Sequence, residues 1–309
     1  MERATRDRKT TAGMECHPAL APFARTLAAP GVSERLFLYD SGGGSAALEG
    51  QAPYPVVLVH GLGDEADTWR HLFPRLARLT RTLAPDLPGF GRSVASARAT
   101  MNLHAEAVIA VLRETGKAVL VGNSLGAAVA ELVAFRAPEL VAALALVDGG
   151  LPSAGSLSPA LLAAFLPGAV ERPYRAWRSD HEGAYKTLEP YYASLAGLGK
   201  DDRDFLKRRV IARVESESQC RAYGSSFRSY LREAIFRRSF YARQLARHGI
   251  PLLVAWGELD RVIPVSARGS ILSIRPDAKT ALIPECGHLP QQEAPEALME
   301  SLERLLASL

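Results

Sequence analysis

The sequence predicts an α/β fold on a mostly parallel sheet, and three observations carry that prediction. Short apolar runs alternate with helical patterns over residues 31–150 and again over residues 249–309. Several of these runs have no polar interruption, which is typical of parallel strands that helices cover on both faces. Between the two stretches, residues 151–248 show helical patterns and no buried strand, which indicates an inserted helical lid. A chain of 309 residues is long enough to bury both parts.

The elements follow one another in a regular order. Residues 1–30 are expected to form a loose N-terminal arm with one short helix over residues 18–27, and residues 34–39 an antiparallel edge strand. A glycine- and serine-rich turn comes next. The main strands are predicted at residues 56–59, 82–85, 118–121, 142–147, 252–255 and 280–283. Helices are predicted in the core at residues 68–79, 102–115, 124–136 and 294–305, and in the lid at residues 158–166, 183–195, 202–214 and 227–247.

Composition is that of an ordinary globular protein, with 48% hydrophobic and 23% charged residues. No apolar run approaches the roughly 18 residues that a membrane-spanning helix needs. The basic N-terminus lacks the apolar stretch and cleavage site of a secretory signal. The three cysteines are too few and too scattered for a disulfide framework or a metal cluster, and they suit a reducing compartment. We therefore expect a cytoplasmic protein without a metal or other cofactor.

Charge is distributed unevenly along the chain. Residues 171–247 contain 17 Lys and Arg against 10 Asp and Glu, whereas the whole chain has a net charge of only +4. Two interpretations are open: solvated helix faces, or a lid that attracts an anionic substrate or a membrane surface. The chain has no stacking platform or DNA-reading motif, which argues against a nucleic-acid partner.

The pentapeptide Gly122-Asn123-Ser124-Leu125-Gly126 is the strongest indication of chemistry. It lies between an apolar run and a helical stretch, so that a strand, G-x-S-x-G and a helix follow one another. This is the setting of a nucleophile elbow, in which a serine on a very sharp turn takes a positive φ. The flanking glycines leave room for the strand and the helix, whose N-terminus favours negative charge beside the hydroxyl. The alternative is a serine that only caps a helix.

A serine hydroxyl needs a base, and with such an elbow the acid and then the histidine follow the serine along the chain. Three histidines follow Ser124. His181 lies in a charged stretch and His248 at a predicted helix end. His288, in contrast, lies in a loop after a predicted strand, where α/β sheets place their chemistry. We predict His288 as the base; the alternative is a loop histidine bonded to the backbone.

Two aspartates compete for the role of the acid. Asp260 and Asp148 each end a predicted strand, and either could reach the far nitrogen of His288. Glu258 lies near Asp260 in the sequence but is expected to face solvent.

A tetrahedral intermediate needs two donors aimed at its oxyanion. We predict the N–H of Leu125, directly after the nucleophile, and the N–H of Leu62, in the glycine-rich turn that follows the strand at residues 56–59. His60 in the same turn is expected to pack and form hydrogen bonds rather than to act as a base.

Four segments, in order and spacing, together resemble the α/β-hydrolase family. They are Val59-His60-Gly61-Leu62-Gly63 with Trp69, Asp86-Leu87-Pro88-Gly89-Phe90-Gly91-Arg92-Ser93, the serine pentapeptide, and Trp256-Gly257-Glu258-Leu259-Asp260-Arg261-Val262-Ile263-Pro264 with Cys286-Gly287-His288. The resemblance implies an eight-stranded, mostly parallel sheet with a lid over the serine, and a triad of Ser124, Asp260 and His288. It favours Asp260 over Asp148, because W-G-x-x-D-x-x-x-P is where such enzymes usually keep the acid. It also implies a structural turn at Asp86.

The resemblance narrows the chemistry as well. Epoxide hydrolases and haloalkane dehalogenases of this fold carry an aspartate at the elbow, and proline iminopeptidases have a tryptophan-containing elbow. This chain has a serine and no tryptophan there, which argues against all three activities. Elbows of the form G-N-S-[ML]-G occur in carboxylesterases, in lipases and in carbon–carbon bond hydrolases of ring-fission products. The last group often has an aromatic residue after the catalytic histidine, whereas Leu289 follows His288 here.

The leading prediction is therefore a serine hydrolase that cleaves a carboxylic ester of a small acyl substrate through an acyl-enzyme. The alternatives are a carbon–carbon bond hydrolase of a ring-fission diketo acid, whose carboxylate a lid arginine would bind, and a non-catalytic ligand receptor on the same scaffold.

Overall fold

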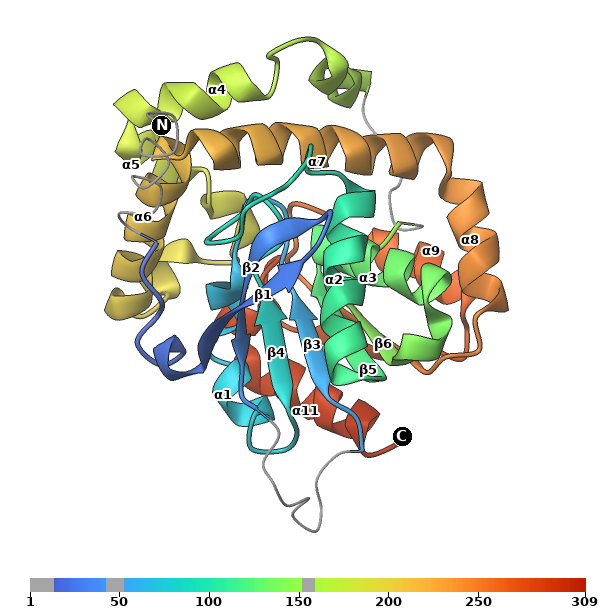
Figure 1. Ribbon diagram of the computed structural model, residues 1–309. Coiled ribbons are helices and arrows are strands. Elements are labelled where there is room, and N and C mark those ends of the chain that lie inside the picture. The colour runs from blue at the N-terminus through green and yellow to red at the C-terminus, as the bar shows by residue number, and fades with distance from the viewer. Residues whose placement is uncertain (1–13, 43–52, 152–158) are drawn as a thin grey trace.

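An eight-stranded sheet forms the centre of the molecule (Figure 1). The computed structural model describes residues 14–42, 53–151 and 159–309. Strands β1 and β2 are antiparallel to their neighbours, and β3 to β8 run parallel, in the order β1-β2-β4-β3-β5-β6-β7-β8. The strands are β1 (Ala24–Ala29), β2 (Ser33–Asp40), β3 (Val56–Val59), β4 (Thr82–Pro85), β5 (Ala118–Asn123), β6 (Val141–Val147), β7 (Leu252–Gly257) and β8 (Lys279–Ile283). The predicted eight-stranded, mostly parallel α/β fold is confirmed.

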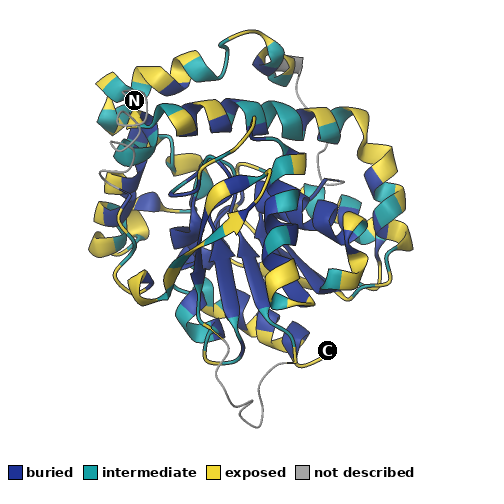
Figure 2. Cartoon of the chain, viewed as in Figure 1, coloured by how far each residue is buried: buried dark blue, intermediate teal, exposed yellow. Residues whose placement is uncertain are grey.

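Helices cover both faces of this sheet. One apolar layer joins it to α2 (Met101–Thr115) and α3 (Leu125–Arg136), and the other joins it to α1 (Phe73–Leu76) and α11 (Pro295–Leu306). Strand β3 shows why both layers form, because its four residues are all buried and alternate between the two layers. The buried residues in Figure 2 accordingly follow the parallel strands through the middle of the molecule.

Further short helices, α9 (Ser266–Ile274) and α10 (Pro290–Glu293), belong to the second half of the core. Residues 159–248, here called the helical insertion, contain no strand in their described structure. Its helices are α4 (Glu171–Ala176), α5 (His181–Lys186), α6 (Lys200–Glu215), α7 (Glu217–Phe236) and α8 (Arg238–Arg247), joined with short 3-10 turns. Figure 1 shows α4 and α7 above the end of the sheet at which α3 begins.

The N-terminal region differs from the predicted loose arm. Residues 24–29 form strand β1 instead of the end of a helix, and Leu20 is fully buried. A single 3-10 turn, Ala21–Phe23, carries Pro22 in its first positions and ends at Phe23, after which exposed and half-buried side chains alternate as in an edge strand. As a result β2, predicted as the edge strand, has a partner on both sides. The part of the predicted arm before residue 14 lies outside the described residues.

Three predicted helices are broken in the structure. The helix predicted over residues 68–79 is a 3-10 turn, Ala66–Trp69, followed by the single-turn α1, which begins next to Pro74. The helix predicted over residues 183–195 ends at Lys186, and a 3-10 turn containing Pro190 follows. The one predicted over residues 227–247 is two helices, α7 and α8, which meet at Arg237. None of the described helices is both long enough and apolar enough to cross a membrane.

Candidate active site

Ser124 lies on the sharp turn between β5 and α3, with a φ of 56°. A Cβ on Gly122 would lie 2.3 Å from the carbonyl oxygen of Gly126, and a Cβ on Gly126 would lie 2.1 Å from that of Val59. Both contacts are far shorter than atoms tolerate, so only glycine fits on either side of the serine. The predicted strand–turn–helix setting and its positive φ are thus present.

His288 and Asp260 form a buried pair. The two carboxylate oxygens of Asp260 have different partners: Oδ2 lies 2.7 Å from His288 Nδ1, and Oδ1 accepts the N–H groups of Val262 and Ile263 at 2.8 and 2.9 Å. An ionised Asp260 therefore fixes the proton of the imidazole on Nδ1. Nε2 is left with a free lone pair, and no described residue forms a hydrogen bond with it.

The backbone of His288 is held from two directions. Its N–H donates to the carbonyl oxygen of Tyr191 in the helical insertion at 2.8 Å, and its carbonyl oxygen accepts the side-chain amide of Asn123 at 3.0 Å. Asn123 directly precedes Ser124, so one side chain links the elbow to the loop that carries the histidine. Neither contact of Asn123 and Tyr191 could be predicted from the sequence, because the order of residues does not indicate which distant backbone groups will meet.

Asp148 has a different set of contacts. Its Oδ1 accepts the N–H of Gly257 at 2.8 Å, and it forms no hydrogen bond with His288. The residue is fully buried, with a φ of 49°. One oxygen of each aspartate and one ring nitrogen of His288 lie within 4.8 Å of one another. Of the two aspartates that the sequence left in competition, Asp260 is the one that contacts the histidine.

The loop after β3 runs directly against the elbow. A Cβ on Gly61 would lie 3.3 Å from the Cβ of Ser124, and both Leu62 and Leu125 line the same cavity as the serine. His60 is fully engaged elsewhere: its Nε2 accepts the N–H of Leu87 at 2.8 Å, so its Nδ1–H donates to the carbonyl oxygen of Gly61, also at 2.8 Å.

The remaining candidates lie away from this pair. His181 pairs with Glu215 in an exposed contact, His248 caps the end of α8, and Glu258 is exposed. Asp86 accepts the N–H groups of Ala66 and Arg92 at 2.7 and 2.8 Å, which is what a structural turn requires.

A cavity of about 830 Å³ opens beside Ser124 and His288. Its walls come from both parts of the molecule and are mainly apolar. The aromatic side chains among them are Tyr174, Trp177, Tyr191, Tyr192, Tyr223, Phe227 and Tyr230, all from the helical insertion. Apart from His288, Asp64 and Arg213 are the only acidic or basic residues in the described lining. They form an ion pair, and Arg213 Nε also donates to Glu65 at 2.7 Å, so neither charge is left uncompensated.

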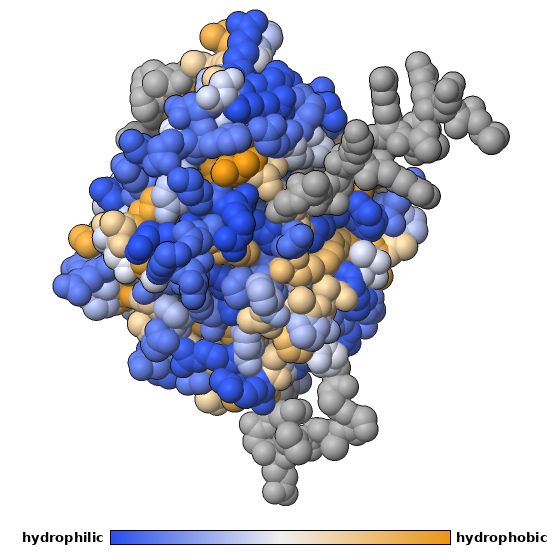
Figure 3. Space-filling model, turned by 90° about the vertical axis from the view of Figure 1, so that its left-hand side faces the viewer, coloured by the Kyte–Doolittle hydropathy of each residue, from blue (hydrophilic) through white to orange (hydrophobic). Residues whose placement is uncertain are grey.

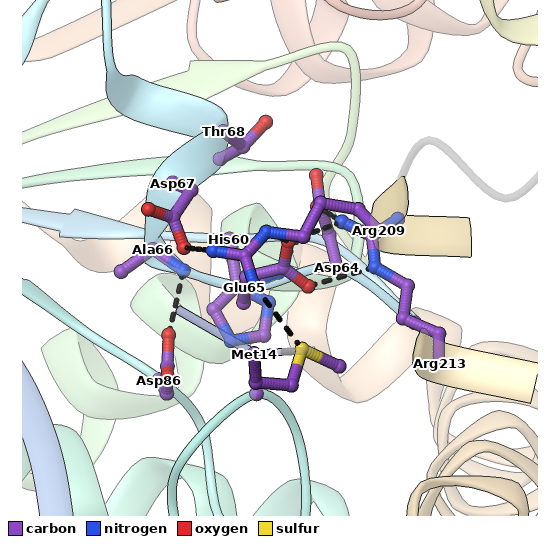
Figure 4. Close-up of polar contacts among 12 residues, drawn as sticks. Met14, His60, Asp64, Glu65, Ala66, Asp67, Thr68, Asp86, Arg209 and Arg213 are labelled. Atoms are coloured by element: carbon purple, nitrogen blue, oxygen red, sulfur yellow. Dashed lines mark hydrogen bonds and ion pairs between the residues drawn. The ribbon is translucent and has the colours of Figure 1, made fainter. Parts of the chain in front are cut away.

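Arg213 also belongs to a buried group of charges that we call the anchor cluster: Glu65, Asp67, Asp86, Arg92, Arg209 and Arg213. Figure 4 shows Arg209 and Arg213 reaching from α6 towards the acidic residues of the loop after β3. Arg209 Nη2 lies 2.8 Å from Asp67 Oδ2, and Arg213 Nη2 lies 2.7 Å from Glu65 Oε1. The sequence did not reveal this cluster, because its acids and the two arginines of α6 are far apart in the chain.

The other charges of the helical insertion lie mostly at the surface. Pairs such as Lys207–Glu182 and Arg175–Glu217 are largely exposed. Figure 3, which views the molecule from the side of α5 and α6, shows a mainly hydrophilic face. These features favour the solvated-face interpretation of the positive charge.

Comparisons with known proteins agree with this architecture. Residues 56–301 match the profile of the "Alpha/beta hydrolase family". A dihydrolipoyllysine-residue acetyltransferase component of an acetoin cleaving system from Pseudomonas putida is 31% identical over 82% of this chain. The chain spans only 64% of that relative's length.

Two other relatives are hydrolases of different bonds. A 2-hydroxy-6-oxo-6-(2'-aminophenyl)hexa-2,4-dienoic acid hydrolase from Metapseudomonas resinovorans is 30% identical, with 81% of this chain and 82% of the relative covered. A pimeloyl-[acyl-carrier protein] methyl ester esterase from Pectobacterium atrosepticum is also 30% identical, with 82% and 94% covered. Among solved structures, an esterase from Thermogutta terrifontis superimposes with a TM-score of 0.71 at 23% identity, covering 92% of this chain and 98% of that one, and it supports the fold alone.

Proposed function

The chain belongs to the alpha/beta hydrolase family, and from this premise we propose that it is a serine hydrolase that cleaves a carboxylic ester through an acyl-enzyme. The observation that carries the proposal is the pairing of Asp260 with His288 at 2.7 Å, beside a cavity that Ser124 also lines. No cofactor is needed for this chemistry, because the three side chains supply the nucleophile, the base and the acid.

In the proposed reaction the Ser124 hydroxyl attacks the ester carbonyl while His288 Nε2 takes its proton. Asp260 keeps the other ring proton on Nδ1 and stabilises the imidazolium that forms. The N–H groups of Leu125 and Leu62 bind the oxyanion. His288 then protonates the leaving alcohol, and a water that it deprotonates releases the acid.

The cavity favours an ester with a neutral, apolar acyl group. Its aromatic walls provide apolar area, and the charges of Asp64 and Arg213 already compensate each other. A carboxylate on the substrate would have to displace Asp64 or Glu65 from Arg213, which leaves a buried charge without a partner. We further propose that residues 151–248 act as a lid, since the helical insertion supplies much of this wall.

Carbon–carbon bond hydrolysis is the second candidate, favoured by the dienoic acid hydrolase from Metapseudomonas resinovorans. It requires a cation for the substrate carboxylate, and Arg213 is the only arginine in the described lining of the cavity. Its two carboxylate partners argue against that role.

The test compares aryl esters of increasing acyl length with a ring-fission dienoate, on the same preparation. We expect hydrolysis of the esters, with kcat/KM rising as the acyl group fills the cavity, and little turnover of the dienoate. A preference for the dienoate would favour the second candidate. Absence of fluorophosphonate labelling at Ser124 in folded protein would favour the non-catalytic receptor.

We also propose a cytoplasmic location. Cys16, Cys220 and Cys286 are all described and form no disulfide, which supports a reducing environment.

A further inference from the structure

Asp148 and Asp260 bring two carboxyl groups together beside His288. They follow β6 and β7, which are neighbours in the sheet and run parallel, so their carboxyl ends lie side by side. Both residues are buried, Asp148 completely and Asp260 with only 6% exposed. Two carboxylates this close in a buried site rarely ionise together, because each raises the cost of charging the other.

Hydrogen bonds indicate which of the two keeps its charge. Asp260 receives three donors: His288 Nδ1–H and the N–H groups of Val262 and Ile263. Asp148 receives one, from Gly257, and this reaches only Oδ1. Its Oδ2 is buried and accepts no hydrogen bond from any described residue. An oxygen with no donor is the natural place for a proton.

No cationic side chain of the described residues pairs with Asp148 and stabilises its charged form. The titratable groups that face Asp148 are Asp260, Glu293, the thiol of Cys286 and, through Asp260, His288. Within the described chain, neither aspartate forms an ion pair with Lys or Arg. Glu293 itself accepts the N–H groups of Gly287 and Ala193, at 2.7 and 2.8 Å.

We propose that Asp148 is a positioning residue that remains a neutral carboxylic acid and donates its Oδ2 proton to the carboxylate of Asp260. The donated hydrogen bond satisfies the one polar atom of Asp148 that otherwise has no partner. It also gives the Asp260 carboxylate a fourth donor, which restricts its orientation towards His288 Nδ1. Asp148 is not among the described lining residues of the cavity, and it acts through Asp260.

The direction of the pKa supports the same assignment. Burial and the neighbouring Asp260 carboxylate raise the pKa of Asp148 well above its usual range, and the Gly257 hydrogen bond opposes this only in part.

Two substitutions at this position separate the possible roles, and both fit its φ of 49°. Asp148→Asn is a neutral isostere: its amide can donate to Asp260 while its carbonyl oxygen accepts the N–H of Gly257, and asparagine tolerates positive φ. Asp148→Gly relieves the backbone and removes the donor. Thermal unfolding of each variant verifies the fold.

We expect Asp148→Asn to retain most of the kcat and to leave the acid limb of the kcat/KM profile in place. Asp148→Gly is expected to lower kcat about tenfold, with KM little changed, since the loss of one hydrogen bond to a charged group is of that size. If Asp148 were ionised, Asp148→Asn would remove a negative charge within 4.8 Å of His288. The acid limb would then move to lower pH by about one unit or more, and the proposal would be overturned. A folded Asp148→Gly variant with wild-type kcat would overturn it equally.

These kinetic outcomes rest on the proposed function, whereas infrared spectroscopy reports the protonation of Asp148 directly. At neutral pH the carbonyl stretch of a protonated Asp148 should appear as a band in the difference between the infrared spectra of the wild type and Asp148→Asn. The carboxyl group of Glu131, whose pKa burial raises to about 8, contributes to both spectra and cancels in that difference. This measurement needs no substrate, so it decides the protonation of Asp148 even if the protein hydrolyses no ester. Absence of this band from the difference spectrum contradicts the proposal.

Discussion

Two buried groups of charge in this protein differ in how they are balanced. In the anchor cluster three carboxylates face three guanidinium groups, and ion pairs of 2.7 to 2.8 Å join them. Beside Ser124, the carboxyl groups of Asp148 and Asp260 share a site with only one imidazole. The paired charges of the anchor cluster fix α6 against the core. The two carboxyl groups beside Ser124 have no such partners, so their surroundings determine which of them is protonated.

The pKa values follow the same division. Burial alone raises the pKa of Glu65, yet Arg213 and Arg209 outweigh it and lower that pKa to about 2. The contribution of Glu65 to stability is therefore present above its unfolded pKa and is lost only as the pH falls towards 2. Asp148 has the opposite sign: its raised pKa means that its ionisation opposes folding as the pH rises. Substitutions in the anchor cluster should thus change stability, and substitutions beside the serine should change turnover.

The largest effect is expected for Ser124→Ala. It removes the nucleophile, so kcat for the best ester should fall by about 10⁶-fold, to the level that binding and the oxyanion donors sustain. Stopped-assay kinetics with active-site titration measure this. Ser273→Ala, at an exposed serine of α9 outside the cavity, serves as the matched control. Turnover near that of the wild type in Ser124→Ala would refute the proposed function.

Asp260→Asn should come next, with kcat reduced by about 10⁴-fold and little change in thermal stability. The amide leaves the imidazole in the wrong tautomer and without a counter-charge. Glu258→Gln is the control on the same loop, because this side chain is exposed. If Asp260→Asn instead lowered thermal stability strongly and left kcat almost unchanged, Asp260 would have a structural role like that of the anchor cluster.

Arg209→Met tests the anchor cluster. It leaves Asp67 and Glu65 buried with one cation fewer, so the free energy of unfolding should fall by about 3–5 kcal/mol. Urea unfolding measures this, with Arg208→Met as the control, since Arg208 is the exposed neighbour on α6. Equal stability of the two variants would show that the anchor cluster does not hold α6 in place.

The smallest effect concerns Glu131, a third carboxyl group buried without a cation. Burial raises its pKa to about 8, although the N–H of Leu151 opposes the shift. The folded-state pKa lies above the unfolded value, so stability is greatest below about pH 4.5 and is lost as the pH rises towards 8. In the wild type, Glu131 should lower the unfolding free energy by up to about 3 kcal/mol between pH 5 and 8. Glu131→Gln should lack this pH-dependent loss of stability. Parallel pH profiles of both proteins in urea would contradict this.

Sequence reasoning worked best where the structure is local. The elbow around Ser124 could be predicted because the clash of a Cβ with the neighbouring strand or helix restricts the flanking residues to glycine. Buried parallel strands such as β3 were equally predictable from their unbroken apolar runs. Strand β1 was missed because an exposed edge strand carries no such run, and its pairing with β2 was not considered.

Contacts between distant segments could not be predicted in the same way. Spacing could not decide between Asp148 and Asp260, because they follow adjacent parallel strands and both lie close to His288. Family resemblance, not geometry, favoured Asp260. The anchor cluster was missed for a related reason: an arginine of the helical insertion such as Arg209 is indistinguishable in sequence from the exposed Arg208 beside it.

The hydrogen bond from His288 to the backbone of Tyr191 constrains how substrate can enter. Arg261 adds a second clamp by donating to the carbonyl oxygens of Glu189 and Tyr192, so residues 189–192 are fastened to both loops that carry the acid and the base. Displacing this segment would loosen the imidazole itself. The cavity wall next to the histidine is therefore tied by hydrogen bonds to the same two loops that hold the acid and the base in position.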